Sequence, residues 1–117
     1  MSWLVGVLSL TAALGLSVVA SSSAAPGTAT TLSRTCISIS AVLSNGPDPG
    51  ADPVGYAQAQ ILPLHRFHTD NHQLKRAIDQ LASAYATYVR HDGDKAAKAV
   101  VKTAARKVNA ICPGAAQ

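Results

Sequence analysis

The side chains whose spacing most clearly suggests a binding chemistry are four cations near the C-terminal end of the chain. Lys95, Lys98, Lys102 and Arg106 are separated by three, four and four residues. On an α-helix this spacing gathers all four charges within about 80° of one face. The preferred interpretation is a solvated face opposite the core, and the alternative is a face that binds anionic envelope polymer, lipid head groups or an acidic partner. Like charges four residues apart repel each other by a few tenths of a kcal/mol per pair, so the pattern opposes helix stability slightly.

A histidine cluster in the middle of the chain is the second group that could do chemistry. His65, His68 and His72 follow one another closely, with Asp70 between them and His91 farther on. Neutral imidazole is a good ligand for zinc, copper or nickel. His68 and His72 would share one face only on a helix that runs through both, and we expect the helix to start at Asp70. The preferred interpretation is exposed linker histidines, and a transition-metal site is the alternative.

Two cysteines, Cys36 and Cys112, lie near the two ends of the segment that follows an apolar leader. In an oxidising compartment two such cysteines are expected to pair. The bridge would close a loop of about 75 residues, and the chain-entropy argument values this closure at roughly 4 kcal/mol. We therefore predict an intramolecular Cys36–Cys112 disulfide.

The leader itself indicates the compartment. An uncharged apolar run over residues 3–20 continues into a tract of small residues, which is typical of a signal-peptidase site. We predict a signal peptide over residues 1–25 and a secreted or extracytoplasmic domain over residues 26–117. The alternative is an uncleaved anchor formed by residues 3–20, which is near the lower limit of length for crossing a bilayer.

Aromatic residues offer a further way to hold a ligand. Tyr85, Tyr88 and His91, together with His65 and Phe67, could line a slot in which tyrosine or histidine binds haem iron. In layout the chain resembles small secreted haemophore-type haem-binding proteins, because it combines a leader, a helical part and two distant cysteines. This resemblance implies haem as a ligand. The tyrosine–histidine motif of that family matches no position here, and tyrosines at helical spacing suit an ordinary core better.

Two helices are predicted before the histidine cluster. The first should end at Asn45–Pro47, and its apolar positions step by four, three and four: Leu32, Cys36, Ile39 and Leu43. The second is predicted over residues 54–62, because Asp52 can cap it and Pro53 suits the first helical position. Its buried side should hold Val54, Ala57 and Ile61. Pro63 lacks the N–H that a continuous helix needs, so the helix should break or kink there.

Two longer helices are predicted after the cluster. The third should run from an Asp70 cap to a stop at Gly93, with one apolar face: Leu74, Ile78, Leu81, Tyr85 and Tyr88. The fourth, capped by Asp94 and stopped at Pro113, presents the four cations opposite its own apolar face: Ala97, Val100, Val101, Ala104, Val108 and Ile111. The predicted class is therefore all-α, a small bundle of about four short helices with one disulfide.

Composition and missing motifs narrow the function. The net charge of +4 is modest, so we expect no nucleic-acid binding. The sequence has no carboxylate pair in an apolar run, no phosphate-binding glycine loop, no CxxC motif and no nucleophile elbow, so we expect no enzymatic activity. The sequence thus predicts a small exported helical protein with a non-catalytic role at or outside the cell envelope. The alternative is a secreted helical protein that binds haem or a metal.

Overall fold

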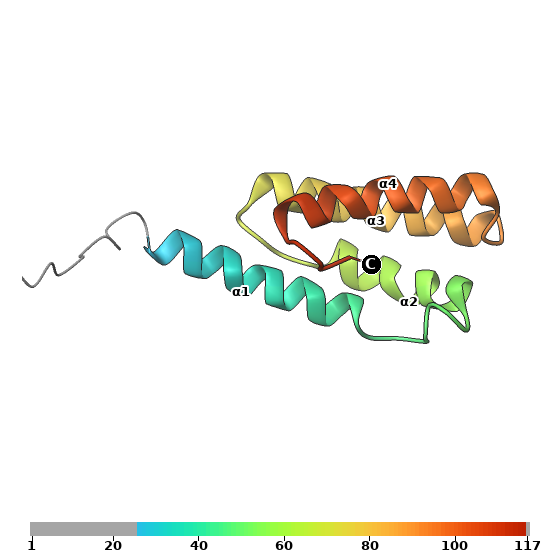
Figure 1. Ribbon diagram of the computed structural model, residues 1–117, viewed down its shortest axis with the longest axis horizontal. Helices are drawn as coiled ribbons and strands as arrows, with labels where there is room; N and C mark the ends of the chain where they lie inside the picture. The colour runs from blue at the N-terminus through green and yellow to red at the C-terminus, as the bar shows by residue number, and fades with distance from the viewer. Residues whose placement is uncertain (1–25, 117) are drawn as a thin grey trace, which may run out of the picture.

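The predicted all-α class is confirmed. The computed structural model describes residues 26–116, and within this range the chain forms helices joined by loops, with no strand (Figure 1). The helices are α1 (Pro26–Leu43), α2 (Pro53–His65), α3 (His72–Arg90) and α4 (Lys95–Ile111). None of the helices in this part of the chain is long and apolar enough to cross a membrane. The predicted signal peptide over residues 1–25 lies outside the described residues.

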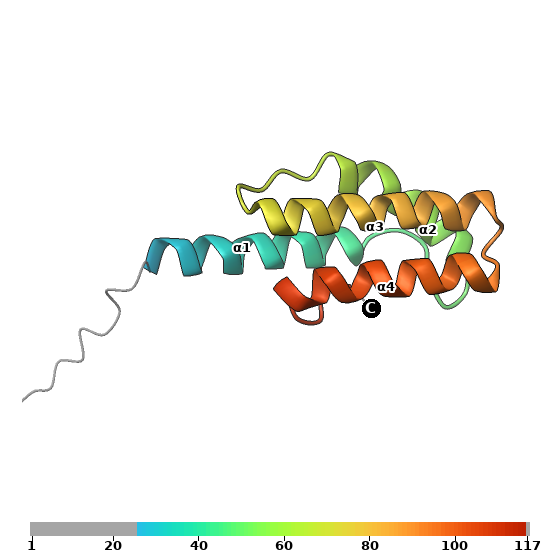
Figure 2. The same ribbon diagram turned by 90° about the horizontal axis from the view of Figure 1, so that it is seen from above.

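The helices form two layers. Helices α3 and α4 lie side by side as an antiparallel pair, and α1 and α2 cover one side of that pair (Figure 1). When the molecule is turned, the N-terminal part of α1 projects past the ends of α3 and α4 (Figure 2). The C-terminal half of α1 is therefore the half that packs in the bundle.

Helix α3 supplies more of the core than any other helix. All five residues of its predicted apolar face are buried: Leu74, Ile78, Leu81, Tyr85 and Tyr88. They meet Ile39 of α1, Leu64 of α2 and Val108 of α4 in one cluster. Buried alanines on α3 and α4, such as Ala84 and Ala104, let these two helices approach closely. A bundle of this size can thus be closed with few large side chains.

Two of the three predicted caps are confirmed. The Asp52 carboxylate accepts the Gly55 N–H at 2.9 Å, and the Asp94 carboxylate accepts the Ala97 N–H at 2.7 Å. The Asp70 cap of the third helix is wrong. The cap is Asn71, whose side-chain oxygen accepts the Leu74 N–H at 2.9 Å. The helix starts one residue later because Asn71 has the extended backbone that a cap requires, and its own N–H is bound by the Thr69 hydroxyl.

The predicted end of the second helix at Leu62 is also wrong. Helix α2 continues through Pro63 to His65, although Pro63 can donate no hydrogen bond. Pro63 lies in the last turn, where the Arg66 N–H still reaches the Leu62 carbonyl at 3.0 Å. The fully buried Leu64 in that turn adds packing that offsets the missing bond.

Two core predictions also need correction. On α2, the buried positions are Ala57, Gln60 and Leu64, whereas Val54 and Ile61 are only half-buried. On α4, Val100 is 49% exposed, because the helix is rotated so that Ala97, Ala104, Ala105 and Val108 face the core. The rotation leaves Val100 on the flank of the helix that borders α3.

Besides the packing of its buried residues, one covalent and two polar contacts hold α1 and the residues just after it to the rest of the bundle. The predicted disulfide is confirmed, with the Cα atoms of Cys36 and Cys112 5.3 Å apart. At the end of α1, the Tyr56 hydroxyl donates to the Leu43 carbonyl at 2.5 Å. The Gln60 side chain donates to the Asn45 carbonyl just beyond it, also at 2.5 Å. The middle of α1 is thus tied to the end of α4, and its C-terminal end is tied to α2.

Candidate functional site

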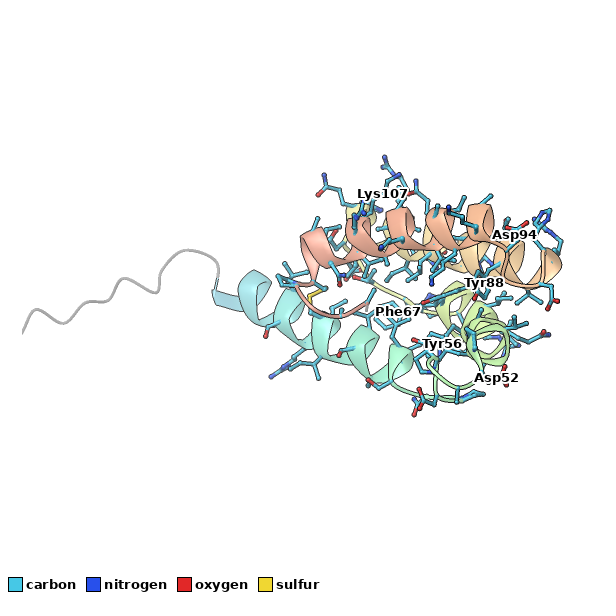
Figure 3. All side chains as sticks on the ribbon, turned by 45° about the vertical axis from the view of Figure 1, so that its right-hand side comes forward. Asp52, Tyr56, Phe67, Tyr88, Asp94 and Lys107 are labelled. Atoms are coloured by element: carbon cyan, nitrogen blue, oxygen red, sulfur yellow. A yellow bond between two sulfur atoms is a disulfide. The ribbon has the colours of Figure 1, made fainter. Side chains whose placement is uncertain are left out.

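The four predicted cations lie on the outer face of α4. Lys95, Lys98, Lys102 and Arg106, here called the basic stripe, are all exposed. A rise of about 1.5 Å per residue places successive charges roughly 4.5 to 6 Å apart along the helix axis. The stripe therefore extends over about 16 Å. Figure 3 shows α4 on the outside of the bundle, between the labelled Asp94 and Lys107, with long side chains directed away from the core.

None of the four cations of the basic stripe forms an ion pair within the described part of the chain. Helix α4 contains no acidic residue, and Asp94 at its start accepts a backbone N–H as the cap. The ion pairs found among residues 26–116 both involve Asp79 on α3. The stripe is therefore a linear array of exposed positive charge with no acidic neighbour on its own helix.

A shallow groove of about 640 Å³ runs between α3 and α4 beside the basic stripe. Buried Ala84 and Ala104 lie in it, and the exposed Val100 borders it. The Lys107 ammonium donates to the Gln80 side chain across it at 3.1 Å. No pattern in the sequence indicates this groove, because its walls come from two helices and each wall consists of small or polar residues typical of an ordinary surface. The groove gives the face of α3 and α4 a concave, partly apolar edge.

Lys75 and Asp79 form an ion pair on α3 that no sequence pattern singled out. The Lys75 ammonium donates to the Asp79 carboxylate at 2.9 Å and to the His65 carbonyl at 3.2 Å. The His65 Nδ1 atom lies 3.9 Å from the same carboxylate. Because His65 is the last residue of α2, this arrangement ties the end of α2 to the start of α3. Its role is therefore structural, and it includes His65, one of the candidate metal ligands.

The candidate metal or haem residues do not converge. His65 ends α2, the exposed His68 lies in the following loop, and His72 is the first residue of α3. Tyr88 and His91 lie at the opposite end of α3, about 27 Å from its start at 1.5 Å per residue. Residues 26–116 bring no three histidine, cysteine, aspartate or glutamate side chains together in a metal-binding arrangement.

The tyrosines of α3 take part in packing. The rings of Tyr85 and Tyr56 meet edge to face, with centroids 5.9 Å apart. Burial raises the pKa of Tyr85, and the neighbouring Tyr56 raises it further. Burial also raises the pKa of Tyr56. The buried Tyr88 lies under the turn at Gly93, where a Cβ atom would stand 2.8 Å from its hydroxyl oxygen. Both tyrosines of α3 thus pack in the core, as their helical spacing predicts.

Comparisons with protein-family models, with curated proteins and with solved structures found no significant match to this chain.

Proposed function

We propose that this protein is an exported, non-catalytic binding protein that contacts an anionic, phosphate-bearing polymer of the cell envelope through the basic stripe of α4. The observation that carries the proposal is a row of four exposed cations on one helix face, none of which forms an ion pair within the described residues: Lys95, Lys98, Lys102 and Arg106. The apolar leader and the paired cysteines support an extracytoplasmic location.

A linear polymer suits the stripe better than the interior of a membrane. The apolar face of α4 packs in the core, with Val108 fully buried, so it is not available for insertion between lipids. The charges repeat every 4.5 to 6 Å or so along a straight helix. An extended chain that carries a phosphate on every repeat can place successive anions against this row. Lipid head groups are the competing source of the same phosphate chemistry.

The test is salt-dependent retention on three surfaces: a polyglycerol-phosphate polymer, anionic vesicles and zwitterionic vesicles. We expect the polymer to retain the protein at low salt and to release it as the Debye length falls from about 10 Å at 0.1 M to about 3 Å at 1 M. The triple variant Lys98→Gln, Lys102→Gln and Arg106→Gln should lose most of this retention. Stronger retention on anionic vesicles than on the polymer would identify lipid as the partner and contradict the proposal.

The matched control carries the same loss of charge elsewhere. Arg76→Gln and Arg90→Gln together remove two exposed cations outside α4, and this variant is compared with the double variant Lys98→Gln and Lys102→Gln. If the stripe is the contact, the control variant keeps most of the retention that the stripe variant loses. Equal losses in the two variants would show a response to net charge alone and would contradict a site on α4.

A further inference from the structure

A second cleft lies away from α4, between α1 and the chain that leads from α2 to α3. Its volume is about 510 Å³. One wall is a flank of α1 that carries Arg34, Ser38 and Val42. The other wall is formed by the end of α2 and the residues after it: Pro63, Arg66, Phe67 and His68. Figure 3 shows the labelled Phe67 in the space between α1 and the α3–α4 layer.

The cleft is cationic on both walls. Of the ten lysines and arginines in the chain, Arg34 and Arg66 are the two that lie outside α3 and α4, and both line this cleft. Both side chains are exposed, and neither forms an ion pair with any residue of the described range 26–116. The described lining contains no aspartate. Two guanidinium groups therefore line one cavity without a counter-ion from the described residues.

The remaining lining can complete a site for a small molecule. The exposed Ser38 hydroxyl makes no hydrogen bond within the described part of the chain and can donate to a ligand oxygen. By contrast, the neighbouring Thr35 hydroxyl already donates to the Thr31 carbonyl at 2.8 Å. The half-buried Phe67 contributes an apolar surface beside these polar groups. A few polar groups beside an apolar wall are typical of ligand sites, and 510 Å³ falls within their usual range of about 300–1,000 Å³.

We infer that this cleft binds a small organic phosphate, whose phosphoryl group lies between Arg34 and Arg66 and whose apolar body lies against Phe67. The planar guanidinium fork matches the oxygens of a phosphate and forms charge-assisted hydrogen bonds to them. The volume of the cleft exceeds what a bare phosphate needs, and Phe67 with Val42 supplies the surface for an aromatic or apolar group.

The disulfide positions one wall of this site. Cys36 lies between Arg34 and Ser38 in α1, and its bridge to Cys112 holds this part of the helix in place. The other contacts of α1 lie toward its C-terminal end, where Ile39 and Leu43 are buried in the core and Tyr56 and Gln60 donate hydrogen bonds. Reduction should therefore free the Arg34 wall while α2, α3 and α4 stay packed. Ligand binding in the cleft should depend on the oxidised state.

The test is a calorimetric titration of the oxidised protein with phenyl phosphate, inorganic phosphate and phenol. We expect saturable binding of phenyl phosphate, weaker binding of inorganic phosphate and no measurable binding of phenol. Arg34→Ala and Arg66→Ala should each weaken phenyl phosphate binding about tenfold, because each removes a charge-assisted contact. Arg34→Lys and Arg66→Lys should recover only part of the affinity, since lysine keeps the charge but lacks the fork. Circular dichroism and intact mass verify the fold and the disulfide of each variant.

The matched control is Arg90→Ala, which removes an exposed arginine of α3 that does not line the cleft. Its affinity for phenyl phosphate should equal that of the wild type. Unchanged affinity in Arg34→Ala and Arg66→Ala, or no saturable binding by the wild type, would overturn the inference. The Lys98, Lys102 and Arg106 variant should still bind phenyl phosphate, so failure of the polymer-binding proposal and failure of this site are distinguishable.

Discussion

The side chain of Asn109 holds the C-terminal tail against α4 by pairing with both backbone groups of Ala116. Its carbonyl oxygen accepts the Ala116 N–H at 2.7 Å, and its amide nitrogen donates to the Ala116 carbonyl. Ala116 is buried and belongs to the core cluster. The tail after the disulfide is therefore part of the packed structure.

We predict that Asn109→Ala lowers the free energy of unfolding by about 1–3 kcal/mol, because it leaves two backbone groups of a nearly buried residue without partners. Urea unfolding followed by circular dichroism measures the change. Asn109→Asp keeps the acceptor for the Ala116 N–H, but it sets a carboxylate oxygen against the Ala116 carbonyl, so it should also destabilise the fold. A stability equal to that of the wild type in Asn109→Ala would contradict a structural role for this pair.

Reduction of the Cys36–Cys112 bridge should lower the unfolding free energy by up to about 4 kcal/mol, because the bridge closes a loop with a sequence separation of 76. Thermal unfolding with and without reductant tests this, and intact mass confirms the redox state. Limited proteolysis should cut first in the N-terminal half of α1, because after reduction the helix is held mainly by buried Ile39 and Leu43 and by the hydrogen bonds at its C-terminal end. An unchanged melting temperature on full reduction would contradict the prediction.

Stability should fall at alkaline pH because of Tyr85. Its pKa in the folded state is raised above the ordinary value of 10.0, mainly by burial, so the unfolded chain releases this proton first. The contribution of this raised pKa to the free energy of unfolding is complete below about pH 10. It is lost as the pH rises further, and the free energy then falls by at most about 1.4 kcal/mol per pH unit. Urea midpoints of the wild type and Tyr85→Phe between about pH 8 and pH 11 test this. The variant should show a flatter decline, and parallel curves would exclude Tyr85 as the cause.

Gly93 and Gly114 provide a matched pair for backbone strain. Both have positive φ angles, +70° and +76°, but only at Gly93 would a Cβ atom meet another residue, at 2.8 Å from the Tyr88 hydroxyl. We predict a loss of about 1–2 kcal/mol for Gly114→Ala, from the left-handed conformation alone. Gly93→Ala should lose clearly more, because the turn or Tyr88 must also move. Equal losses in urea unfolding would show that the Tyr88 contact relaxes without cost.

Much of the fold could be predicted from local sequence signals. The apolar face of α3 from Leu74 to Tyr88 follows from one helical period, and its strong separation of apolar and polar residues left no competing arrangement. The Asp94 cap and the Cys36–Cys112 bridge likewise required only neighbouring residues or a count of cysteines. Such signals are reliable because no distant part of the chain competes with them.

The errors arose where tertiary contacts decided between local alternatives. Asp70 and Asn71 are adjacent residues that can both cap a helix, and the Thr69 hydroxyl that binds the Asn71 N–H accompanies the later start. Gln60 is a polar residue, so its type gives no sign of burial. It is nevertheless only 1% exposed, because its side-chain amide donates a hydrogen bond to the Asn45 carbonyl. The clefts beside Lys107 and Arg34 each lie between two helices, and no periodicity within one helix could reveal them.

The positions of the two cysteines also have a mechanical consequence. Cys36 and Cys112 enclose α2, α3 and α4 and the last part of α1 in one covalent loop. Tension applied between the two ends of the chain would pass from α1 directly into the short tail after α4 through the sulfur–sulfur bond. The enclosed helices would carry no load, so a molecule tethered at one end and pulled at the other would keep its α3–α4 face intact.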